Sequence, residues 1–339
     1  MLHQEVTAPV YGASIASSSM GAAGEPIPAS VAAVVFGTWV GLLLRVVLQD
    51  LYDVDVSAVV FPALYANFVG CIIMGVATRR KDQLLSKYRP LYSGITTGLA
   101  GSLTTFSSWN SSAVFSALGY NQELESPAER ALSWVTIMLV GFAVAFFGYW
   151  VGIAVAESSW PWGPADDAST GSKEAPIVLV YTVTRAEYVF VGTVAICYAG
   201  IIVAAVVSPD LQAIALSTAV APLGSLPRCL LGRALSKSKA PLGTLLCNVV
   251  GTAVAAAACV LQFSNTRTSP DCRLYTAVVI GFCGCLTTVS TLIVELTTLP
   301  RKLATAYALV TVAVAQALAF LIVELVGSSI PEPHIMCTI

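Results

Sequence analysis

The chain has 339 residues, of which 56% are hydrophobic and 11% are charged, and its formal net charge is −2 at pH 7. Because a soluble domain carries about 25% charged residues, this composition indicates a polytopic membrane protein, and the near-neutral charge favours no nucleic-acid partner. Both histidines, His3 and His334, lie in the polar tails. The apolar segments thus hold no histidine for zinc or acid–base chemistry and no paired carboxylates, so we expect no enzyme.

The N-terminal residues 1–29 are rich in Ala, Ser, Gly and Pro and contain no Lys or Arg, which predicts a disordered tail rather than a signal peptide. Apolar segments long enough to cross a bilayer, about 20 residues each, follow. Nine are expected, at 31–49, 57–77, 91–118, 131–155, 186–207, 211–232, 241–262, 274–299 and 303–326. They define a four-helix repeat (30–155), a polar cytosolic linker (156–184), a connecting span (185–208), a second four-helix repeat (209–327) and a C-terminal tail (328–339).

The Lys and Arg residues predict the orientation, because cytoplasmic loops are enriched in them. The 78–90 loop holds five, and placing it inside puts most of the 17 basic residues inside. This predicts a cytosolic N-terminus and an extracellular C-terminus.

Short motifs recur in the second half of the chain. Gly41-x3-Arg45 in the first span matches Gly224-x3-Arg228 in the sixth. Asn67-x2-Gly70 in the second span matches Asn248-x2-Gly251 in the seventh. Four spans are thus repeated as four, and the single connecting span reverses the direction of the second set. This predicts an inverted-topology repeat with antiparallel halves.

A third repeated motif places small hydroxylated residues inside an apolar segment, at Gly101–Trp109 and again at Gly284–Leu292. Freed backbone groups at membrane depth are tolerated only against protein or a water-filled cavity, so two breaks predict the centre of a permeation or binding site. Alternatively, the hydroxyls bond to carbonyls of their own helix. The residues concerned are Thr104, Thr105, Ser107, Ser108, Thr287, Thr288, Ser290 and Thr291.

In their order, spacing and duplication, these motifs resemble the fluoride channel family, called Fluc or CrcB in bacteria and FEX in eukaryotes. The resemblance covers about residues 31–326. It implies an all-α membrane protein with nine transmembrane helices arranged as 4+1+4 and a broken third helix in each half. It also implies a eukaryotic source, the plasma membrane, fluoride as the transported ion and a functional monomer in the lipid bilayer.

The resemblance further implies a structural Na⁺ between the two broken helices. In the family, backbone carbonyls hold this ion, and the matching positions are Gly101, Thr104, Gly284 and Thr287. Such an ion would bridge the halves and favour a nearby anion.

The halves differ at the family's two pore-lining aromatics. The first half has Phe106 and Trp109, whereas the second has Val289 and Leu292. Without the motif, a phenylalanine in a span would be taken as facing lipid or filling the core.

The family's glutamate, six residues after the first aromatic, is kept as Glu295 but replaced by Ser112 in the first half. Tyr307 and Thr311 resemble the Tyr-x3-Ser track along the family's pore. Trp134 and Met138 stand in the approximate place in the first half.

Asn67 and Asn248 are amides in apolar surroundings, used either for interhelical hydrogen bonds or as donors to dehydrated F⁻. Arg45 and Arg228 lie near the ends of their spans. They either snorkel or draw anions to two vestibules.

These residues suggest one working pore, made of Phe106, Asn248, Tyr307 and Thr311, and a degenerate pore around Asn67. The other pore candidates are Trp109, Thr105, Ser108, Thr288, Thr291 and Glu295. We expect a fluoride-selective channel for passive export from the cytosol. The alternative is a secondary active transporter, an antiporter of a small anion, for which Glu295 is the proton-relay candidate.

Overall fold

The computed structural model describes residues 27–51, 61–120, 126–158, 184–208, 211–263 and 270–327. Within these ranges the chain is helical, with no strand. The expected tails, except for residues 27–29, lie outside the described residues, as does most of the 156–184 linker.

The first half runs from α1 to α7, and the segment expected as its third span is divided into pieces. In chain order its elements are α1 (Ile27–Asp50), α2 (Leu64–Arg79), α3 (Lys81–Lys87), α4 (Arg89–Ser93), the π-helical segment η2 (Gly94–Ala100), α5 (Gly101–Leu103), α6 (Phe106–Leu118) and α7 (Pro127–Glu157). Gly119 ends α6 with a positive φ of 80°. Ser126 caps α7 through a reciprocal pair of hydrogen bonds with Glu129. The sharp ends of these helices therefore follow from local sequence signals.

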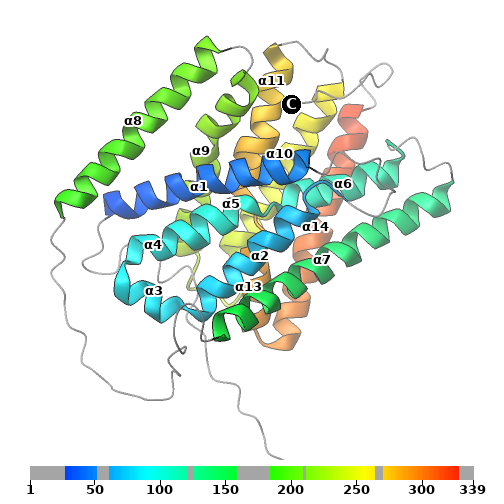
Figure 1. Ribbon diagram of the computed structural model, residues 1–339. Helices are drawn as coiled ribbons and strands as arrows, with labels where there is room; N and C mark the ends of the chain where they lie inside the picture. The colour runs from blue at the N-terminus through cyan, green and yellow to red at the C-terminus, as the bar shows by residue number, and fades with distance from the viewer. Residues whose placement is uncertain are drawn as a thin grey trace, which may run out of the picture.

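The second half repeats this order after one connecting helix, α8 (Arg185–Val207). It comprises α9 (Gln212–Ala234), α10 (Leu242–Phe263), α11 (Pro270–Thr276), the π-helical segment η4 (Ala277–Cys283), α12 (Gly284–Leu286), α13 (Ser290–Thr298) and α14 (Arg301–Gly327). Helix α8 packs mainly on α1 and α9 at the edge of the bundle (Figure 1) and is largely exposed, as expected of a connector in lipid.

Seven described helices, counting α11 to α13 as one, are long and apolar enough to cross a membrane. Helix α2 is a shorter apolar helix, and α4 to α6 form the expected third span. The all-helical, polytopic membrane architecture and the two broken helices are confirmed. The count of nine spans, the domain boundaries and the inverted orientation of the halves stay predictions.

Glycines in the repeated motifs allow helices to approach closely at equivalent points of the two halves. A Cβ atom on Gly41 would lie 2.5 Å from the carbonyl oxygen of Leu99, and one on Gly224 would lie 2.3 Å from that of Phe282. Without a side chain, each helix can lie directly against the divided span of its own half. This contact positions the arginine that follows four residues later.

Candidate functional site

The two broken helices meet in the interior of the protein. In the first half, Thr104 and Thr105 are extended between α5 and α6, and in the second half Thr287 is extended after α12. All three residues are completely buried. A π-helical segment precedes each break, a local irregularity that often accompanies functional sites.

An asparagine replaces the backbone partner lost at each break. The backbone N–H of Thr105 donates to Oδ1 of Asn67 at 2.8 Å, and Nδ2 of Asn67 donates to the Thr105 carbonyl at 3.3 Å. Asn248 and Thr288 make the same pair of bonds, at 2.9 and 3.1 Å. Both asparagines thus form interhelical hydrogen bonds. Each NH₂ group uses one of its two hydrogens, leaving the other for a further acceptor.

Each half also caps a helix of the other half. Oγ1 of Thr287 accepts from the backbone N–H groups of Phe106, at 3.2 Å, and Ser107, at 3.1 Å, at the start of α6. Oγ1 of Thr104 accepts from the backbone N–H of Ser290, at 3.2 Å, at the start of α13. Caps of this kind satisfy N–H groups that have no partner in their own helix. The two threonines therefore join the halves through main-chain contacts.

The same threonine hydroxyls also donate to carbonyls four residues earlier, Thr104 to Ala100 and Thr287 to Cys283, each at 3.0 Å. Each of these threonines thus bonds to a carbonyl of its own helix and also contributes to the polar centre, so both interpretations of the sequence apply to the same side chain. The eight predicted hydroxyls form two hydrogen-bonded groups at this centre, and each group joins the two halves. One group contains Thr104, Thr288, Ser290 and Thr291. The other contains Thr105, Ser107, Ser108 and Thr287.

The two motif arginines reach this centre from the opposite half. Arg45, which is 1% exposed, donates from Nη1 to the Gly284 carbonyl at 2.6 Å and from Nη2 to that of Ile280. Arg228, which is 6% exposed, donates from Nη2 to the Thr97 carbonyl at 2.7 Å. These buried positions correct the expectation of snorkelling or vestibule side chains, since main-chain carbonyls in the interior hold both guanidinium groups.

The carbonyls of the predicted sodium ligands suit a hard cation. The Gly101 and Gly284 carbonyls lose their helical donors, because the N–H groups of Thr105 and Thr288 bind asparagine side chains instead. The Gly284 carbonyl, however, accepts from Arg45, and a Cβ atom on Gly101 would lie 2.1 Å from Nη1 of Arg228. Main-chain carbonyls are the type of ligand that suits Na⁺, but one of the four is already engaged, and a sodium ion there would lie close to two guanidinium groups.

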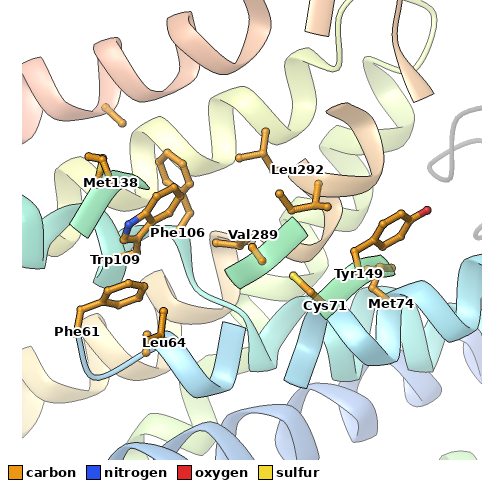
Figure 2. Packing of buried hydrophobic residues seen from close by; sticks show 14 of the residues in the cluster. Phe61, Leu64, Cys71, Met74, Phe106, Trp109, Met138, Tyr149, Val289 and Leu292 are labelled. Carbon is orange, nitrogen blue, oxygen red and sulfur yellow. The ribbon is translucent and has the colours of Figure 1, made fainter. Parts of the chain in front are cut away.

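Phe106 and Trp109 adjoin each other in the core (Figure 2), with ring centroids 5.6 Å apart at an interplanar angle of 85°. Both are fully buried. The indole N–H of Trp109 donates to the Ile137 carbonyl at 2.9 Å, so this group is engaged within its own half. In the second half, the equivalent Val289 and Leu292 are also fully buried and offer neither a ring edge nor a polar hydrogen.

Glu295 and Tyr307 form a second polar group. The carboxylate of Glu295 accepts from the hydroxyl of Thr244 at 2.5 Å and from that of Tyr307 at 2.9 Å. The hydroxyl of Thr311, the other predicted member of this track, donates to the Tyr307 carbonyl at 2.7 Å. Thr244 was missed by the sequence interpretation. Its signal was the four-residue spacing from Asn248, which places both side chains on one face of α10.

These features define an all-helical, polytopic membrane protein in which two broken helices meet at a buried polar centre. A family model described as CrcB-like protein, Camphor Resistance (CrcB), matches residues 32–152 and 215–327. The chain therefore belongs to this family, as the resemblance of the motifs predicted.

Two relatives share the name Fluoride export protein 1. The chain is 26% identical to the Neurospora crassa protein over 340 residues, an alignment that covers 82% of this chain and 62% of the relative. It is 25% identical to the Candida albicans protein over 289 residues, covering 78% of this chain and 71% of the relative. The chain thus spans less than two thirds of the Neurospora protein. No solved structure matches.

Proposed function

We propose that the protein is a fluoride-selective channel that allows passive export of F⁻ from the cytosol. The observation that carries this proposal is the buried centre, where two broken helices bring hydroxyl and amide donors together in apolar surroundings. Fluoride is small and strongly hydrated, so a pore must replace its lost water with closely placed donors. The names of the two fungal relatives support fluoride as the ion.

One working and one degenerate pore follow from the difference between the halves. Helix α6, which carries Phe106, packs against α10 and α14 of the second half. This brings Phe106 near the helices that carry Asn248, Tyr307 and Thr311. The positive edge of an aromatic ring attracts an anion, and the second N–H of Asn248 adds a donor.

The other contact region joins α13 to α2 and α7. Here Val289 and Leu292 fill the space that the aromatics take in the first half, so we assign the degenerate pore to this region, around Asn67.

We further propose that the halves are antiparallel, with the N-terminus cytosolic and the C-terminus extracellular in the plasma membrane. The equivalent contacts of Arg45 with one half and Arg228 with the other support a twofold relation. Cys272 is disulfide-bonded, which supports an oxidising exterior at the start of α11. Since the halves cap each other within one chain, we propose a functional monomer.

A structural Na⁺ at the carbonyls of Gly101, Thr104, Gly284 and Thr287 is part of this proposal. It would bridge the two broken helices, and its charge would add to that of the arginines near the ion path. Its place beside two guanidinium groups predicts weak binding, because like charges repel strongly in a site shielded from water.

The alternative function, an antiporter of a small anion, is favoured by Glu295, a membrane carboxylate whose hydrogen-bond partners, Thr244 and Tyr307, are neutral. Fluoride efflux from liposomes containing the purified protein distinguishes the two. A K⁺ gradient with valinomycin supplies the voltage, while pH and Na⁺ are equal on both sides. A channel releases F⁻ rapidly under these conditions and retains Cl⁻. Efflux that requires an imposed proton gradient would support the antiporter.

A further inference from the structure

A chain of three polar side chains, two of them buried, crosses between the halves one helical turn beyond Phe106. Gln316 of α14 donates from Nε2 to Oδ1 of Asn110, on α6, at 2.7 Å and to the Asn110 carbonyl at 3.3 Å. The indole N–H of Trp134, on α7, donates to Oε1 of Gln316 at 3.1 Å. Asn110 is fully buried and Gln316 is 5% exposed. Three side chains with N–H groups thus meet at the junction of α6, α7 and α14.

The orientation of both amides is determined by the two ends of this chain. An indole can only donate, so the oxygen of Gln316 faces Trp134 and its NH₂ group faces Asn110. At the other end, Nδ2 of Asn110 donates to the Phe106 carbonyl at 2.9 Å, and a carbonyl can only accept. All hydrogens therefore point in one direction, from Trp134 toward Phe106. The second hydrogen of the Asn110 NH₂ group remains for another acceptor.

Asn110 follows Phe106 by four residues, which places both side chains on the same face of α6. An ion that passes the Phe106 ring away from the central break would next meet the amide of Asn110. In the second half, the residue equivalent to Asn110 is Ile293, which is fully buried and apolar. Among the described residues, the place equivalent to Asn110, one turn beyond Val289, thus has no amide.

We propose that Asn110, Gln316 and Trp134 form a second fluoride-binding position, beyond Phe106 on the side away from the central break. This inference rests on the proposed fluoride channel. The ion accepts hydrogen bonds from Nδ2 of Asn110 and from Nε2 of Gln316, which exchanges its longer bond to the Asn110 carbonyl for the ion. Trp134 keeps Gln316 in the donating orientation. The position selects a small anion that accepts strong hydrogen bonds.

The test compares Gln316→Met, which keeps the length of the side chain but removes its donors, with the wild type in the liposome assay. Asn110→Ile is the second variant, because it installs the residue that the other half tolerates at the equivalent place. Gln262→Met is the matched control. Gln262 is also a buried glutamine in a membrane helix, but it donates to Thr276 and not to Asn110 or Trp134. Thermal unfolding in detergent is measured for all three.

We expect Gln316→Met and Asn110→Ile each to slow F⁻ efflux at least about fivefold, the effect of about one lost hydrogen bond, and to reduce selectivity over Cl⁻. Gln262→Met should keep the wild-type rate and selectivity. Unchanged efflux in the folded variants would overturn the inference. The inference would also be overturned if F⁻ efflux slowed only in proportion to a loss of thermal stability, and to the same extent in Gln262→Met. If the wild type releases no F⁻, the proposed channel function itself fails, so the two failures can be distinguished.

Discussion

The side-chain oxygen of Thr287 lies 3.1 Å from the backbone nitrogen of Ser107, a residue of the other half of the chain. Thr104 makes the equivalent contact with Ser290, at 3.2 Å. In both contacts, the hydroxyl that caps the helix belongs to the opposite half of the protein. The two halves are therefore joined through main-chain contacts, although the sequence presents them as repeats.

Replacing Thr287 by Val should destabilise the protein by about 1–2 kcal/mol, because the N–H groups of Phe106 and Ser107 lose their cap. Thermal unfolding in detergent measures the change. Thr252→Val is the matched control, since the hydroxyl of Thr252 is equally buried but bonds only to the Asn248 carbonyl of its own helix. Equal losses in the two variants would argue against a special role of the contact between the halves.

Removing Na⁺ should lower the melting temperature of the wild type, because a bound ion stabilises the folded state by mass action. Arg45→Gln removes a positive charge beside Gly284, so we expect half-maximal stabilisation at a lower Na⁺ concentration in this variant. Unfolding curves at several Na⁺ concentrations, with an organic cation at constant ionic strength, provide the measurement. A melting temperature that does not depend on Na⁺ in either protein would contradict a sodium site at the centre.

Asn248→Asp should abolish most F⁻ efflux, whereas Asn67→Asp should leave it largely intact. Both substitutions remove an NH₂ donor and add a negative charge at equivalent places beside a break, so their effects on stability should be similar. The efflux differs because only Asn248 is assigned to the working pore. The reverse result would show that the two pores have been assigned the wrong way round.

Glu295→Gln should leave electrogenic efflux possible without a proton gradient, because a channel requires no carboxylate to carry a proton. The variant keeps the size of the side chain and one carbonyl oxygen, which can still accept from Thr244 or Tyr307. Efflux driven by valinomycin at equal pH tests this. If instead the wild type needs a proton gradient and the variant no longer responds to it, Glu295 is a proton carrier and the antiporter is the better description.

The breaks at Thr104 and Thr287 could be predicted because Gly and hydroxylated residues in the middle of an apolar segment are a local signal. The fold class and the family followed from the same motifs. The partners of Arg45 could not be predicted, because its acceptors, at Gly284 and Ile280, lie in the other half of the chain. A single glutamine such as Gln316 is not part of a motif. Its hydrogen-bond partners depend on how the helices pack, so the sequence alone does not predict them.

The most direct test of a single working pore compares Phe106→Val with Val289→Ile in electrogenic F⁻ efflux from liposomes. Phe106→Val gives the first half the residue that the second half already has, so the fold should tolerate it. Val289→Ile makes an apolar change at the equivalent buried place. One working pore at Phe106 predicts that efflux is lost in Phe106→Val and persists in Val289→Ile. Efflux at the wild-type rate in Phe106→Val would contradict it.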